Sequence, residues 1–158
     1  MSTPTLNGIH HIRIPVSDLA TSLSWYQRVL DATHRPEYNH YALDGTLNAY
    51  ILDIPTLPLV ELRLAPLTAA GCKGFDPLIF SVPGRSDIEA WIRHLDAEGV
   101  EHSPELRGLL GWTLVFLDPD GLALRVYTEE VHEWDHDKAD LHSPWLYTSR
   151  DAQAPTAG

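Results

Sequence analysis

The sequence predicts an α+β fold of two tandem βαβββ modules, in which a curved, partly closed mixed sheet surrounds a concave site and the helices lie outside. Segments His11–Val16 (HIRIPV) and Pro77–Val82 (PLIFSV) match at an offset of 66 residues, and Leu59–Leu64 matches Ala123–Tyr127 at an offset of 64. Repetition at a nearly constant period indicates a duplicated unit. In each copy, strand-like alternation gives way to helical spacing and then returns. We expect module 1 over about 8–67, a linker over 68–74, module 2 over about 75–128 and a C-terminal extension over 129–158.

The helices of both modules have recognisable starts. Asp18 is the expected N-cap of the first helix, because a carboxylate there accepts hydrogen bonds from the first turn. Ser86–Glu89 (SDIE) has the form of a capping box for the second helix, and Gly99 is its expected end. Asp118–Gly121 (DPDG) predicts a tight turn between two strands of module 2.

Composition excludes several classes of partner. The 158 residues carry a net charge of −11 and no cluster of Lys or Arg, whereas nucleic-acid binding requires a basic surface. No apolar run approaches the roughly 20 residues of a membrane span. Residues 1–8 lack the regions of a signal peptide, and the single cysteine, Cys72, is typical of a reducing compartment. We expect a cytoplasmic protein with a small-molecule ligand and without nucleic-acid or membrane partners.

Alternation along the strands predicts which side chains line the concave face. The apolar residues of each strand must cover the helices, so its polar residues share the opposite side. By this rule Asp76 points away from Pro77. His10 likewise points away from His11, and the register of His40 cannot be read. The polar side chains expected on the concave face are His11, Arg13, Glu61, Arg63, Ser81, Arg125 and Tyr127.

The sequence resembles the vicinal oxygen chelate superfamily, which includes glyoxalase I, bleomycin-resistance proteins and extradiol dioxygenases. The matching features are the duplicated module, His11 seven residues before Asp18, the pair Trp25 and Tyr26, Val60–Leu62 (VEL) and the turn Asp118–Gly121. The resemblance covers residues 8–128. It implies a small-molecule enzyme or binding protein, and a homodimer.

The resemblance also implies where a metal would bind. Metal enzymes of the family take one ligand from the first and last strand of each module, and these positions fall at His11, Glu61, Pro77 and Arg125. Proline has no donor side chain, and arginine stays protonated and cannot ligate a cation. Since a transition metal usually needs three or four protein ligands, we expect no cofactor. The alternative is a divalent metal ion held by His11, Glu61 and an unidentified residue.

Without a metal, Arg125 opposite Glu61 suggests an ion pair at the metal position. The charges form either a satisfied internal network or a binding site, since three arginines exceed what one carboxylate neutralises. The second reading predicts an anionic carboxylate or enolate ligand. The candidate catalytic residues are His11, Glu61 and Tyr127, with His11 transferring the proton and Tyr127 either donating to an oxyanion or lining the wall. The candidate ligand contacts are Arg13, Arg63, Arg125, Ser81 and Trp112.

Three functions fit these residues. The first is a metal-independent, glyoxalase-like enzyme acting on a small anionic or carbonyl-bearing metabolite, with His11 as the acid or base. The second is a binding protein similar to the bleomycin-resistance members, which uses the cavity without chemistry. The third is a metal-dependent lyase, isomerase or dioxygenase with an unusual centre. One scaffold supports all three, so the fold alone does not choose among them.

Overall fold

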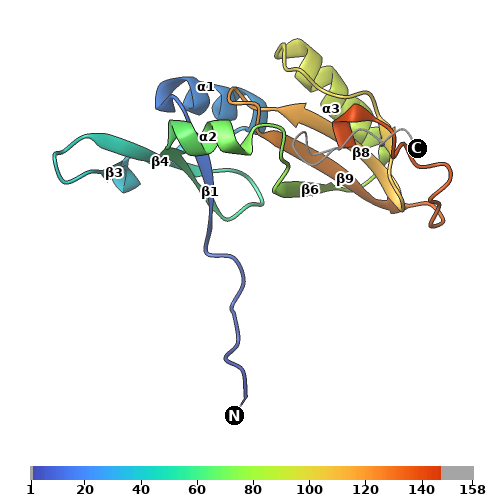
Figure 1. Cartoon of the computed structure of the whole chain (residues 1–158), viewed down its shortest axis with the longest axis horizontal. Helices are drawn as coiled ribbons and strands as arrows, with labels where there is room; N and C mark the ends of the chain where they lie inside the picture. The colour runs from blue at the N-terminus through green and yellow to red at the C-terminus, as the bar shows by residue number, and fades with distance from the viewer. Residues whose placement is uncertain (1, 147–158) are drawn as a thin grey trace, which may run out of the picture. The chain divides into compact units, whose positions relative to one another are not determined.

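The computed structural model describes residues 2–146, and the chain divides into two compact units, Met1–Ala69 and Ala70–Gly158 (Figure 1). Strands and helices alternate in both units, which confirms the predicted α+β class. The strands of the described residues lie in two sheets, one in each unit. None of the helices within these residues has the length and apolar character of a membrane span.

The first unit contains one helix and a mixed sheet. Its sheet has the strand order β1-β5-β4-β2, with the short β3 paired to β4, and β1 runs parallel to β5. A 3-10 turn, η1, lies between β2 and β3. The elements are β1 His11–Val16, α1 Leu19–Leu30, β2 Thr33–His34, η1 Pro36–Tyr38, β3 His40–Tyr41, β4 Leu47–Asp53 and β5 Leu59–Leu64.

The second unit repeats this plan. Its sheet has the order β6-β9-β8-β7, in which β6 is parallel to β9 as β1 is to β5. A short helix, α2, joins the two units, and a 3-10 turn, η2, follows β9. The elements are α2 Pro66–Cys72, β6 Leu78–Val82, α3 Arg85–Ala97, β7 Leu106–Arg107, β8 Gly111–Leu117, β9 Ala123–Val131 and η2 Pro144–Leu146. The matching strand orders show that the predicted βαβββ repeat is present.

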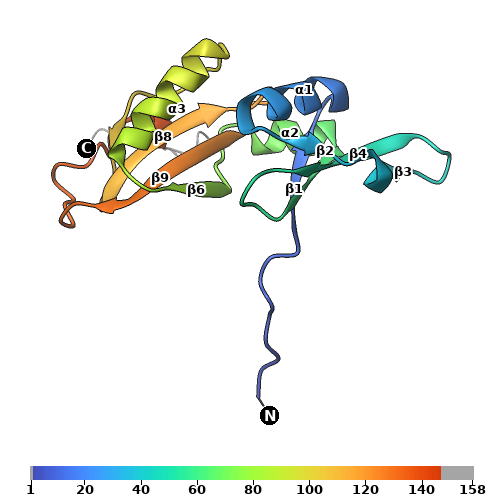
Figure 2. The same cartoon turned by 180° about the vertical axis from the view of Figure 1, so that it is seen from behind.

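Each sheet packs one face against its helix (Figures 1 and 2). In the first unit, Ile14 and Leu62 are buried on the side of α1, which contributes Trp25 and Tyr26. In the second unit, Phe116 of β8 is buried and stacks on Trp91 of α3 at a ring-centroid distance of 5.8 Å. Because side chains alternate along a strand, the residues between these core positions occupy the opposite faces.

The two long helices begin differently from one another. Asp18 is the N-cap of α1 as predicted, and its Oδ1 accepts a hydrogen bond from the Thr21 amide at 2.7 Å. The capping box predicted at Ser86–Glu89 is wrong, because α3 begins at Arg85. Asp87 instead accepts a hydrogen bond from the Gly84 amide at 2.8 Å, so the helix starts two residues earlier than the motif suggested.

The other element boundaries agree only in part with those expected from the sequence. Gly99 follows α3 with a φ of 66°, and Gly121 closes the predicted turn by donating to the Asp118 carbonyl at 2.9 Å. α2 occupies most of the segment expected to be a linker, and β9 continues to Val131, inside the expected C-terminal extension. The last part of that extension, residues 147–158, lies outside the described residues.

Candidate functional site

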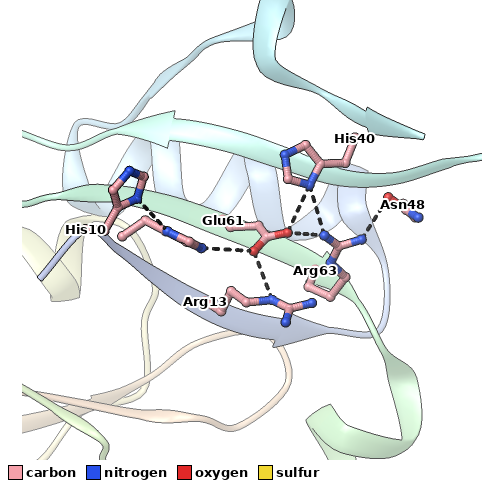
Figure 3. A network of polar contacts seen from close by, with 7 residues as sticks. His10, Arg13, His40, Asn48, Glu61 and Arg63 are labelled. Atoms are coloured by element: carbon pink, nitrogen blue, oxygen red, sulfur yellow. Dashed lines mark hydrogen bonds and ion pairs between the residues drawn. The ribbon is translucent and has the colours of Figure 1, made fainter. Parts of the chain in front are cut away.

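Glu61, in β5, is the centre of a polar network on the face of the first sheet opposite α1 (Figure 3). Its side chain is only 2% exposed, yet both carboxylate oxygens have cationic neighbours. Oε2 lies 2.9 Å from Nε of Arg13, and Oε1 contacts Nη2 of Arg63. The strands produce this geometry, because Arg13 is the cross-strand partner of Glu61 and Arg63 lies two positions along β5.

Two histidines flank the same carboxylate. Nε2 of His11 lies 3.7 Å from Oε2 of Glu61, and Nδ1 of His40 lies 3.2 Å from Oε1. His40 belongs to β3, which reaches the network by pairing with β4. The side chain of His10 also joins, since its Nδ1 lies 2.9 Å from Nδ1 of His11. The prediction that His10 points away from His11 is therefore wrong: His10 precedes β1, so strand alternation does not apply to it.

Arg63 is held by partners of the protein itself. Nη1 donates to Oδ1 of Asn48 at 2.9 Å, and Nη2 reaches Nδ1 of His40 at 2.9 Å as well as Glu61 (Figure 3). Arginine only donates hydrogen bonds, so a bond from Arg63 requires Nδ1 of His40 to be the acceptor. Both terminal nitrogens of Arg63 are occupied. Its guanidinium therefore positions Glu61 and His40.

Arg13 is held at one point only. Its Nε contacts Glu61, and within residues 2–146 no other side chain or carbonyl pairs with its two Nη groups. The side chain is 59% exposed, so the open edge of the guanidinium is accessible to a ligand. Two guanidiniums face one carboxylate here, in a chain whose net charge is −11. The two Nη groups of Arg13 are the donors that this arrangement can offer to an anion.

The corresponding face of the second sheet carries a different ion pair. Nη2 of Arg125 contacts Oδ2 of Asp76 within the second unit, which differs from the expected pairing of Arg125 with Glu61. The prediction that Asp76 points to the other face is wrong. β6 begins only at Leu78, so Asp76 lies in irregular backbone that does not follow strand alternation.

The other predicted site residues of the second unit have protein partners. Ser81 donates to Oε1 of Glu129 at 2.7 Å. The Tyr127 hydroxyl accepts hydrogen bonds from the amides of Leu110 and Gly111, at 3.2 and 3.0 Å. This contact indicates that Tyr127 supports the loop before β8.

Arg85 and His132 both contact the ring of Trp112. The Arg85 guanidinium carbon lies 5.0 Å from the centre of the Trp112 ring. His132 meets the same ring edge-on at a centroid distance of 5.1 Å. A planar ligand would have to displace one of these two groups to stack on Trp112.

The side chains present do not fit the metal centre of the related enzymes. Both oxygens of Glu61 already contact guanidinium groups, and a cation placed there would be repelled by Arg13 and Arg63. In the second sheet, Arg125 occupies the position that Glu61 has in the first, and its cross-strand partner is Ile79. Neither side chain can be a metal ligand. Within the described part of the chain, no three His, Cys, Asp or Glu side chains are grouped to hold a metal ion. The donor set suits an anion.

The fold defines a class, the α+β proteins built from two βαβββ modules. The family model described as Glyoxalase/Bleomycin resistance protein/Dioxygenase superfamily matches residues 8–126, and the chain belongs to this superfamily. It is 30% identical over 135 residues to the Escherichia coli (strain K12) protein YaeR, described as uncharacterized; the match covers 78% of this chain and 98% of YaeR.

Solved structures show the same fold at low identity. A glyoxylase/bleomycin resistance protein/dioxygenase domain from Frankia sp. EAN1pec has a TM-score of 0.63 and 24% identity, covering 80% of this chain and all of that one. The fosfomycin resistance protein FosX from Listeria monocytogenes has a TM-score of 0.63 and 17% identity, covering 80% and 96%. Lactoylglutathione lyase from Agrobacterium tumefaciens has a TM-score of 0.57 and 13% identity, covering 80% and 96%.

Three members of the network were missing from the concave set that the sequence predicted. They are His10, His40 and Asn48. His40 sits in a two-residue strand with a register shift, where alternation cannot be counted. The available signal was compositional. A histidine pair stands at the start of β1, and His40 and Asn48 lie in β3 and β4.

Proposed function

We propose that this protein is a glyoxalase-like enzyme that binds a small anionic metabolite through Arg13, without the metal centre of its relatives. The observation that carries the proposal is the half-satisfied guanidinium of Arg13, fixed at Nε by Glu61 and open at both Nη groups. A carboxylate, enolate or phosphonate group would complete this fork with two parallel hydrogen bonds. Arg63, already paired with Glu61, Asn48 and His40, would position the site without contacting the ligand, and Arg125 is paired with Asp76 in the second unit.

His11 is the proposed proton-transfer group. Its side chain is 45% exposed and lies beside Glu61, which would stabilise an imidazolium formed during the reaction. Histidine is the side chain that most readily gains and loses a proton near neutral pH. An anion seated on Arg13 would lie close to His11, because the two residues are two positions apart on the same face of β1. We also propose a cytoplasmic location and a homodimer.

Binding of anion probes tests the role of Arg13. Titration calorimetry with oxalate and with inorganic phosphate should show binding that falls by about tenfold or more in Arg13→Gln, as expected for loss of a charge-assisted pair. Arg93→Gln is the matched control, because Arg93 is exposed on α3 in the second unit. Equal binding by the two variants would contradict the proposal.

The second step of the test concerns chemistry. Once a substrate is found, His11→Ala should abolish turnover while binding of the anion survives. Turnover that is unaffected by this substitution would exclude His11 as the acid or base.

A binding protein without catalysis is the second candidate. It is favoured by the contacts of His11, whose Nδ1 is engaged by His10 and whose Nε2 faces Glu61, so neither ring nitrogen is free in the unliganded protein. In this case the ligand would be recovered unchanged after incubation with the protein. Mass spectrometry of the recovered ligand distinguishes the two candidates, because a modified ligand excludes simple sequestration.

A further inference from the structure

The segment that follows β9 is attached to the second unit along its length. We call residues 132–146 the C-terminal strap. In the loop before β8, the Leu110 carbonyl accepts from the His132 amide at 2.8 Å and the Leu109 carbonyl accepts from the Asp135 amide at 3.0 Å. In β7, the Arg107 carbonyl accepts from the Asp140 amide at 2.8 Å. The carboxylate of Asp140 accepts a return bond from the Arg107 amide at 2.6 Å. These contacts clamp the strap against one edge of the sheet.

The end of the strap packs on the sheet itself. Trp145 and Leu146, in η2, lie against a buried apolar cluster. The cluster consists of Leu106 of β7, Val115 of β8 and Ala123 of β9, which are 4%, 1% and 4% exposed. The strap therefore covers this cluster together with Leu117 of β8. Burial of apolar surface of this kind stabilises the covered arrangement.

The covered face is the one that carries Arg125. Val115 is the cross-strand partner of Arg125, so the two side chains lie on the same face of the sheet. The opposite face holds Phe116, which packs on α3. Because β9 takes the place in its sheet that β5 takes in the other, this face corresponds to the one that holds the Glu61 network. One face is open and polar, and its counterpart is covered.

We infer that the C-terminal strap is an internal occupant of the second module, filling the face that corresponds to the ligand face of the first. Trp145 and Leu146 take the space of a ligand there, and the pair of Arg125 with Asp76 is structural. The anion site is thereby confined to the first module. Release of the strap uncovers a second face of the sheet, lined by this apolar cluster, that suits a ligand with an apolar surface.

Dye binding tests this inference with a matched pair of variants. The probe is 8-anilinonaphthalene-1-sulfonate, an apolar anion whose fluorescence reports exposed apolar surface. Trp145→Ala should raise the dye fluorescence several-fold and increase hydrogen exchange of the β8 amides. Trp134→Ala is the control, because Trp134 belongs to the same strap but is 69% exposed. The same dye binding and exchange in both variants would overturn the inference.

A second pair protects the test against a general loss of folding. Asp140→Ala removes the clamp to the Arg107 amide, while Asp137→Ala removes a carboxylate that is fully exposed. Circular dichroism should show both chains folded, and only Asp140→Ala should bind more dye. No difference between them would also overturn the inference. Phosphate binding at Arg13 should persist in every strap variant, so this result is separable from that of the proposed function.

Discussion

Glu61 is a buried carboxylate whose charge is balanced by two guanidiniums from neighbouring positions of the sheet. An ion pair with one exposed partner contributes little, but a buried group that loses its counter-charge is strongly destabilising. The burial of Glu61 therefore makes it the most sensitive member of the network. Arg13, which is more than half exposed, can lose its partner at lower cost because water replaces it.

Replacing this carboxylate should destabilise the fold. Glu61→Gln leaves Arg63, whose side chain is only 23% exposed, without its counter-charge, so we expect a loss of roughly 3 kcal/mol in the free energy of unfolding. Urea denaturation followed by circular dichroism measures it. Glu37→Gln, which removes an exposed partner of Arg35, should leave the midpoint unchanged. An unchanged midpoint for Glu61→Gln would show that the network does not hold the sheet.

Individual residues of the site were predictable only where strands are regular. Alternation correctly grouped Arg13, Glu61 and Arg63 because each lies inside a six-residue strand. It failed for His10 and Asp76, which lie just outside the strands, where alternation does not fix the direction of a side chain. The ligand roles of these residues remain predictions that the proposed titrations address.

At the scale of elements, the charged carboxylate of Asp18 caps the start of α1. Asp18 accepts hydrogen bonds from the backbone amide and the hydroxyl of Thr21, and these hold the pKa of Asp18 below its usual value. A carboxyl whose pKa is lowered on folding stabilises the folded state at pH values above its unfolded pKa. That contribution disappears as the pH falls through the folded pKa.

Removal of the cap should therefore have a pH-dependent effect. Asp18→Ala should lower the melting temperature by a few degrees at pH 7, and the difference from the unsubstituted chain should shrink as the pH falls below about 4. Ser24→Ala, at an exposed position within α1, should not lower the melting temperature, since alanine favours a helix. A difference that stays constant from pH 7 to about 2 would contradict the capping role.

Helix starts illustrate the limit of local prediction for whole elements. Asp18 was identified because one acidic residue stands directly before an apolar helical pattern. At α3, the motif Ser86–Glu89 predicted the start, but the helix uses Gly84 and Asp87. Glu130 of β9 settles the choice, because its Oε2 accepts from the Arg85 amide at 2.7 Å. That partner is distant in sequence, so no local motif could reveal it.

For the molecule as a whole, the duplicated module was the most predictable property. Strands of the two copies occupy equivalent places in their sheets, as the repeat in the sequence required. A C-terminal extension packing through Trp134 and Trp145 was predicted; Trp145 does pack on the sheet, whereas Trp134 is exposed. The attachment of the strap to β7 and to the loop before β8 was not predictable, because its hydrogen bonds come from irregular backbone. Helix α2 was missed because its sequence is short and rich in small residues.

The metal content of the whole protein tests the prediction that it works without a metal centre. Plasma mass spectrometry of untagged protein dialysed against metal-free buffer should find far less than one transition metal per chain, because the Glu61 oxygens are taken by arginines. Chelator treatment should leave oxalate binding unchanged. About one metal per chain, lost in His11→Ala, would contradict this and favour a metal-dependent enzyme with an unusual centre.

The difference between the open face of the first module and the strap-covered face of the second has a consequence for how such a chain can diverge. Duplication supplies two copies of the module, and a ligand site has to be kept in only one of them. The other module can accept apolar substitutions on the corresponding face, and a C-terminal segment can then pack there as part of the hydrophobic core. Variation that alters ligand choice should then accumulate in the first half, while the second half serves as a stable platform.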